Sequence, residues 1–197
     1  MGVAAVVARL SSVHVEKTVV ADHTLTYSFD VDDTGRCSGT YVEPGVDVEF
    51  ITDGERTVIT TDEGTLGAQL DGRWLELPHQ PTTPLSSLTT QCWGGPLDVV
   101  FMTTDGAGRW WWLADAKRIG VDQVGGRATV HFRKAEGGHT ADTWVFAERS
   151  SPRLAKLTST ESDGVTQTMV FSQFDSAGPV RPMPADDHIV SAGQLSV

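Results

Sequence analysis

The amino-acid sequence predicts a mostly β (α+β) fold, in which one curved antiparallel sheet of about eleven strands surrounds a few short helices. Thr and Val each occur 23 times among the 197 residues, and β-branched side chains favour the pleated, half-buried surface of a sheet. Many segments alternate apolar and polar residues, and Asp-Gly or Gly-Gly pairs suited to tight turns separate them. Only two or three segments have helical spacing, so a curved sheet that cups these helices is the economical arrangement.

The first third of the chain predicts a helix followed by a meander of strands. Residues 3–11 place Val3, Val6, Val7 and Leu10 on one side of a short helix. From residue 12 to 62 the period changes to two, and we expect a first hairpin over 12–32 and further strands at about 36–43, 46–52 and 56–61.

The middle of the chain predicts a short strand and a helical insert over 73–103. The strand over 73–77 ends at Pro78, and Thr83 followed by Pro84 is a typical helix start. Strands then return at about 110–123, 127–135, 140–148, 153–161 and 165–174. The tail, 175–197, is expected to run over the surface and fray.

Length and charge limit the classes of function. A chain of 197 residues fits a single domain over 1–197. Its 15 basic and 26 acidic residues give a net charge of −11, which repels nucleic acid and anionic lipid surfaces. The aliphatic run from Val3 to Ala8 ends at Arg9 and is too short to span a membrane.

The two cysteines, Cys37 and Cys92, have neither zinc-ligand nor redox spacing. We favour a disulfide between them, which would stabilise the fold by on the order of 4 kcal/mol and would indicate an oxidising compartment. The alternative is two buried free thiols.

The order of several short motifs resembles the LolA/LppX-type (LppX/LprG-like) lipoprotein carriers of cell envelopes, over nearly the whole chain. Each motif is weak by itself, and their shared order and spacing carries the resemblance. The matching pieces are Ser12-Val13-His14-Val15, Gly72-Arg73-Trp74-Leu75-Glu76-Leu77-Pro78, Val124-Gly125-Gly126-Arg127-Ala128, Ser151-Pro152-Arg153-Leu154, Phe171-Ser172-Gln173-Phe174 and Pro184-Ala185-Asp186-Asp187.

The resemblance implies an eleven-stranded half-open barrel around helices, with a hollow that accepts the acyl chains of lipids or lipoproteins. It also implies a place outside the cytoplasm, in the cell envelope or secreted, often with an N-terminal lipidated cysteine. This chain departs from that pattern because it shows no signal segment and because Cys37 lies too far inside. Either a leader was removed or the protein is not lipidated.

An apolar hollow needs aliphatic and aromatic side chains on one face of the sheet. The alternative, weighed equally on the residues alone, is that the same side chains fill a closed core. The candidates are Phe29, Val48, Phe50, Ile59, Leu75, Leu85, Leu88, Val100 and Phe101.

Four tryptophans are candidates for a rim or a partner surface. Alternation along a strand places Trp111 on one face and Trp110 and Trp112 on the other face. At least one of these rings should therefore meet solvent, a ligand or a partner. Packing of both faces by the rest of the chain is equally consistent with the pattern. Trp93, beside Gly94-Gly95, could belong to a lid, although a buried anchor at a helix end is the stronger interpretation.

No enzyme, cofactor or metal motif is found, so we expect a non-enzyme without cofactor or metal. His131 and His139 are interpreted as turn residues rather than metal ligands, and Asp186-Asp187-His188 as a solvated cluster. The leading hypothesis is an extracytoplasmic carrier of lipid or lipoprotein acyl chains. The alternatives are an envelope protein-interaction or sensory scaffold without a lipid, and a hydrolase with a polar constellation in the hollow.

Overall fold

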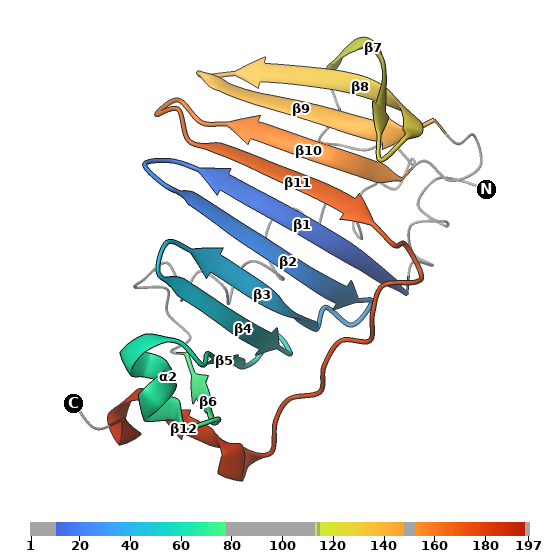
Figure 1. The fold of residues 1–197 in the computed structure, drawn as a ribbon. Coiled ribbons are helices and arrows are strands. Elements are labelled where there is room, and N and C mark those ends of the chain that lie inside the picture. The colour runs from blue at the N-terminus through green and yellow to red at the C-terminus, as the bar shows by residue number, and fades with distance from the viewer. Residues whose placement is uncertain (1–10, 78–112, 114, 148–152, 196–197) are drawn as a thin grey trace.

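Residues 11–77, 113, 115–147 and 153–195, which the computed structural model describes, form one curved, unclosed sheet of twelve strands (Figure 1). The order across the sheet is β12-β6-β5-β4-β3-β2-β1-β11-β10-β9-β8-β7. The predicted fold class is confirmed, with twelve strands in place of about eleven. The organisation as a single domain stays a prediction.

The first six strands follow one another as neighbours in the sheet, apart from a short helix before the sixth. They are β1 (Ser12–Val20), β2 (Thr24–Asp32), β3 (Cys37–Glu43), β4 (Val46–Thr52), β5 (Thr57–Thr60) and β6 (Trp74–Glu76). Each pairs with the previous one in antiparallel register, as Figure 1 shows. The predicted strands over 36–77 agree with these bounds to within one residue at each end.

The second group of strands returns toward β1. It comprises β7 (Lys117–Val124), β8 (Arg127–Glu136), β9 (His139–Phe146), β10 (Leu154–Thr160) and β11 (Thr166–Ser172). β11 pairs with β1 in antiparallel register from His14 opposite Ser172 to Val20 opposite Thr166, and this pairing joins the two groups into one sheet. Of the expected strand over 110–123, residues 110–112 and 114 lie outside the described residues; Asp115 lies in a turn with a φ of 67°, and β7 begins at Lys117.

Three expectations about helices and the tail need correction or lie outside the described residues. A helix that the pattern did not predict, α2 (Gly64–Leu70), precedes β6 and buries Leu70 completely. The expected helix over 3–11 is described only at residue 11, which is not helical, and the insert from 78 to 103 is outside the described residues. No helix of the described residues is long and apolar enough to cross a membrane.

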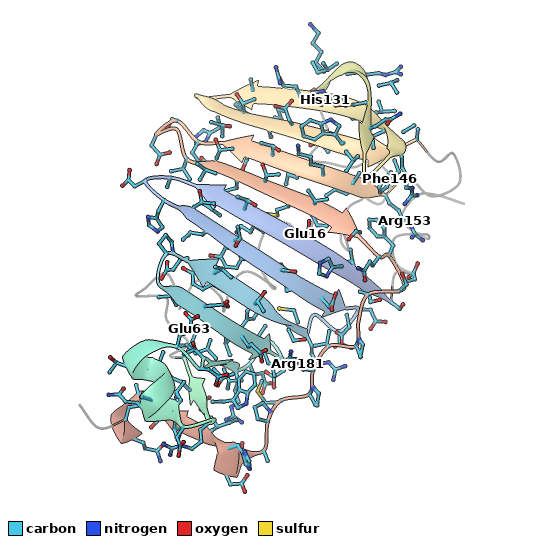
Figure 2. The ribbon with its side chains drawn as sticks, in the orientation of Figure 1. Glu16, Glu63, His131, Phe146, Arg153 and Arg181 are labelled. Carbon is cyan, nitrogen blue, oxygen red and sulfur yellow. The ribbon has the colours of Figure 1, made fainter. Side chains whose placement is uncertain are left out.

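The expectation that the tail frays is wrong for its last described part. β12 (Ile189–Ser191) adds to the sheet in parallel register beside β6, and Val190 is buried. On the way there, the backbone N–H of Arg181 donates to Ser38 Oγ at 3.0 Å, and its guanidinium pairs with Glu49 (Figure 2 labels Arg181). Burial of an apolar side chain and these contacts fix the tail against the sheet.

The sheet has an apolar face and a polar face, because successive side chains of a strand point to opposite sides. The apolar face carries Val13 and Val15 of β1 and Tyr27, Phe29 and Val31 of β2, all of them buried. The polar face carries the residues between them, such as His14, Glu16 and Ser28. The main core cluster of the described residues lies on the apolar face.

Candidate functional site

The predicted ligand residues that the structure describes lie together on the apolar face. A row of directly paired residues crosses eight strands there, and four of the candidates belong to it. Val48 lies in the neighbouring row. The residues of the first row, in sheet order, are Val190, Leu75, Ile59, Phe50, Gly39, Phe29, Val15 and Phe171.

Gly39 is the only residue of this row without a side chain, and the packing explains it. The rings of Phe29 and Phe50, its partners on either side, have centroids 6.0 Å apart. A Cβ added at Gly39 would lie 2.1 Å from the backbone oxygen of Ser28 and 2.5 Å from Cβ of Phe29. The glycine therefore lets the two rings close over β3.

The second row contains a buried charge among apolar side chains. Lys17 is paired with Tyr27 on one side and Met169 on the other, and only 6% of its surface is exposed. Its ammonium nitrogen lies 5.3 Å from the centroid of the Tyr27 ring. Burial lowers the pKa of Lys17 from 10.5 to about 8, because desolvation penalises the charged form.

Tyr41 continues this row on β3. Its ring centroid lies 4.9 Å from that of Tyr27, and its hydroxyl donates to a carboxylate oxygen of Glu43. Burial and this hydrogen bond raise the pKa of Tyr41 well above its usual value. The apolar face is thus not uniformly apolar, because its second row carries the amine of Lys17 and the phenols of Tyr27 and Tyr41, all three of them buried.

Burial across the apolar face is uneven. At its centre the large apolar side chains are at most 4% exposed, as for Phe29 and Tyr27, whereas Val19, Leu25 and Val46 are partly buried. Toward the β7 edge, Phe132 of β8 and Leu157 of β10 are only half-buried, and Val121 of β7 is 67% exposed. Val145 of β9 and Leu154 of β10 are buried, so the apolar face is most exposed at its β7 edge.

The other predicted site residues lie outside the described residues, so their roles stay predictions. This applies to Leu85, Leu88, Val100 and Phe101 of the proposed hollow, and to Trp93, Trp110, Trp111 and Trp112 of the proposed rim. Cys37 is fully buried on β3, and Cys92 lies outside the described residues. The Cys37–Cys92 disulfide likewise stays a prediction.

The polar face holds a cluster on β7 to β10 that sequence reasoning missed. The rings of His131 and of Trp144 on β9 stack with centroids 4.4 Å apart, and the ammonium nitrogen of Lys156 on β10 lies 4.6 Å from the centroid of the Trp144 ring (Figure 2 labels His131). The indole N–H of Trp144 donates to Asp122 at 3.1 Å. Alternation alone could have placed His131 and Trp144 on one face, but not opposite each other.

Asp142 is the centre of the charges in this cluster. Its carboxylate accepts hydrogen bonds from Arg133 at 2.8 and 3.0 Å, and one of its oxygens lies 2.5 Å from His131 Nε2. Partial burial opposes ionisation, but the hydrogen bonds from Arg133 and His131 outweigh it and hold the pKa of Asp142 below its usual value. Because these groups satisfy one another, the arrangement stabilises the sheet and leaves few groups for a ligand.

His131 and His139 do not approach each other as metal ligands. His131 contacts Asp142, whereas His139 pairs with Glu161. No group of three or more His, Cys, Asp or Glu side chains among the described residues could hold a metal ion. In the tail, Asp186 pairs with Arg56 at 2.9 Å, but its side chain is 88% exposed and its neighbours Asp187 and His188 are exposed too, as expected of a solvated cluster.

A serine, a histidine and an aspartate line up on the polar face of β1 and β2. His14 Nδ1 lies 2.7 Å from Asp30 Oδ1, and Ser28 Oγ lies 3.4 Å from His14 Nε2. An acyl-transfer site also needs N–H donors aimed at the developing oxyanion. β2 pairs with strands on both sides, so the backbone N–H groups around Ser28 belong to the sheet ladders. The geometry therefore does not favour the hydrolase alternative, whose constellation was expected on the apolar side.

No protein-family profile matches the chain, and no curated protein matches it by sequence. Among solved structures, an uncharacterized conserved protein from Thermus thermophilus is similar at 8% identity and a TM-score of 0.47, over 93% of this chain and 92% of that chain. A chain of the crystal structure of MucB in complex with MucA(peri) is similar at 17% identity and a TM-score of 0.39, over 94% of this chain and 55% of that one.

A chain of the Pseudomonas aeruginosa MucA/MucB complex is similar at 18% identity and a TM-score of 0.36, over 99% of this chain and 60% of that one. This chain therefore spans less than two thirds of the length of either chain from the MucB complexes. None of these likenesses assigns it to a family.

Proposed function

We propose that this protein is a non-catalytic carrier that binds the acyl chains of a lipid or lipoprotein against the apolar face of its sheet. The observation that carries the proposal is the continuous apolar face, whose side chains are buried at its centre, half-buried at Phe132 and Leu157 and exposed at Val121. Transfer of methylene groups from water to such a surface contributes about 0.8 kcal/mol each, so an acyl chain is the ligand that this face suits best.

The proposed place of action is the cell envelope or the space outside the cell. The resemblance to LolA/LppX-type carriers supports it, and the expected disulfide between Cys37 and Cys92 fits an oxidising compartment. The proposal involves neither a cofactor nor a metal.

Native mass spectrometry of the purified protein, followed by organic extraction, tests the proposal directly. We expect acyl-chain ligands at a defined stoichiometry, and uptake of a fluorescent fatty acid after delipidation. An apo mass combined with no uptake would contradict the proposal and would favour the interaction scaffold.

Two variants on one strand separate the two faces of the sheet. Leu157 and Thr158 are neighbours on β10, and both are half-buried, but they point to opposite faces. We expect Leu157→Gln to weaken fatty-acid uptake and Thr158→Gln to leave it unchanged, with both variants folded by circular dichroism. Equal effects of the two substitutions would show that the apolar face is not the site.

A further inference from the structure

β7 is an open edge of the sheet. Among the described residues, no strand pairs with β7 on the side away from β8, and six of its eight residues are exposed. The opposite edge, β12, has only three residues. An edge strand presents unpaired backbone N–H and C=O groups to any extended chain that approaches it.

Natural sheet edges are often protected by charges and bulges, and β7 has both. Lys117 and Arg118 open the strand, and the register shifts between Arg118 and Gly120. Beyond this bulge, however, the pairing with β8 is regular from Gly120 to Val124. Ile119 is 48% exposed and Val121 is 67% exposed, so the edge also presents β-branched side chains to solvent.

The charge of this edge is opposite to that of the whole protein. The segment from 117 to 136, which forms the β7–β8 hairpin, contains five basic and two acidic residues, whereas the chain as a whole has a net charge of −11. Neither Lys117 nor Arg118 forms an ion pair with the described residues, while Arg133 is held by Asp142. A local excess of unpaired positive charge favours a negatively charged partner.

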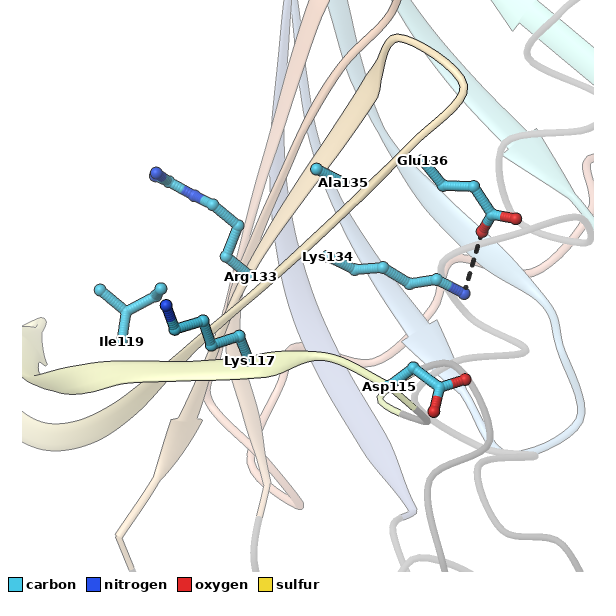
Figure 3. A pocket seen from close by; sticks show the side chains of 7 residues that line it. All are labelled: Asp115, Lys117, Ile119, Arg133, Lys134, Ala135 and Glu136. Atoms are coloured by element: carbon cyan, nitrogen blue, oxygen red, sulfur yellow. Dashed lines mark ion pairs between the residues drawn. The ribbon is translucent and has the colours of Figure 1, made fainter.

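An open pocket of about 760 Å³ lies where the two strands of this hairpin meet the preceding turn (Figure 3). Lys117 and Ile119 of β7 line it with Arg133 of β8, and Asp115 lies at its far end in Figure 3. Lys134 also lines it and pairs with Glu136 at 3.4 Å. The pocket places a cation next to an exposed aliphatic side chain at the start of the open edge.

From these observations we propose that β7 is a docking edge for an acidic, extended segment of another protein, which adds to the sheet as a further strand beside Gly120–Val124. Backbone hydrogen bonds provide the pairing, Val121 provides an apolar contact, and Lys117 and Arg118 select carboxylate side chains. A second copy of this chain fits less well, because it would bring two hairpins of net positive charge together. This inference does not depend on lipid binding by the apolar face.

The test uses the full chain and synthetic peptides in which valine or threonine alternates with glutamate. Binding is followed by fluorescence anisotropy, and strand addition by hydrogen exchange of the amides of 120–124. A matched peptide with lysine in place of glutamate controls for charge, and a peptide with N-methylated backbone controls for strand pairing. We expect only the unmodified glutamate peptide to bind and to slow exchange at β7.

Two variants make the test reciprocal. The double variant Lys117→Glu/Arg118→Glu should lower the affinity for the glutamate peptide at least about tenfold, and this variant should bind the lysine peptide instead. Val121→Glu should also lower the affinity for the glutamate peptide. Val42→Glu is the matched control, because Val42 is a 40% exposed valine of the interior strand β3, and it should leave this affinity unchanged.

Three results would overturn the proposal. The first is no binding of the glutamate peptide at millimolar concentration. The second is equal binding of the N-methylated peptide, which would reduce the edge to a charged surface. The third is protection of 120–124 that rises with protein concentration in the absence of peptide, which would assign the edge to self-association.

Discussion

Replacing Lys17 with methionine perturbs the apolar face at its one buried charge among the described residues. Methionine has a similar length and no charge, so it fills the same space beside Tyr27 without placing an ammonium group in an apolar environment. We expect the difference in unfolding free energy between Lys17→Met and the wild type to depend on pH.

The size of the pH-dependent change in unfolding free energy follows from the pKa of Lys17. Burial lowers this pKa from 10.5 to about 8, which at 1.36 kcal/mol per pKa unit corresponds to roughly 3 kcal/mol. Below about pH 8 the lysine is protonated in both the folded and unfolded chain, and the full cost of burying the charge is present. Between about pH 8 and 10.5 only the unfolded chain keeps the proton, so the stability of the wild type rises with pH.

The assay is urea unfolding of both proteins from neutral pH to about pH 10.5. The unfolding free energy of Lys17→Met minus that of the wild type should be largest below about pH 8 and should fall by roughly 3 kcal/mol across the window above it. Lys117→Met, at an exposed lysine of β7, serves as the control for the removal of a lysine that is not buried. A difference for Lys17→Met that does not change with pH would refute the reasoning, because Lys17 would then be equally solvated in both states.

Three further predictions concern packing and covalent structure. Gly39→Ala should destabilise the protein by about 1–3 kcal/mol in chemical denaturation, because its Cβ would meet backbone at 2.1 Å, whereas Gly120→Ala meets nothing within 4 Å and should change stability by less than about 0.5 kcal/mol. Val190→Ala should cost about 1–2 kcal/mol and should speed proteolysis of the tail, and an unchanged cleavage rate would show that β12 does not anchor it. If Cys37 and Cys92 are paired, alkylation in denaturant should label no thiol before reduction, and reduction should lower the unfolding free energy by on the order of 4 kcal/mol. Labelling of both cysteines without reductant would rule the disulfide out.

Much of the fold could be predicted from local pattern. Val46, Val48 and Phe50 alternate with acidic residues, and the strand over 46–52 has the bounds that this alternation predicts. The same alternation places Phe29 and Phe50 on one face of the sheet. Such predictions succeed because the direction of a side chain in a strand depends on its immediate neighbours alone.

The candidate site could be predicted only in part. The alternation identified which side chains share the apolar face, but not how deeply each is buried. Phe29 is 3% exposed and Val121 67% exposed, although both are apolar residues of the same face. Their burial depends on which strands flank them, and that depends on the order of strands in the whole sheet.

The sequence by itself determined the mostly β class, most strand bounds and the apolar and polar faces, because these follow from side-chain chemistry and a period of two. The tertiary structure alone decided that β11 pairs with β1 and that β12 lies parallel to β6. It also decided that β7 is left as an open edge and that His131 stacks on Trp144. Backbone hydrogen bonds between distant strands are nearly independent of side-chain identity, so no local pattern specifies which strands they join.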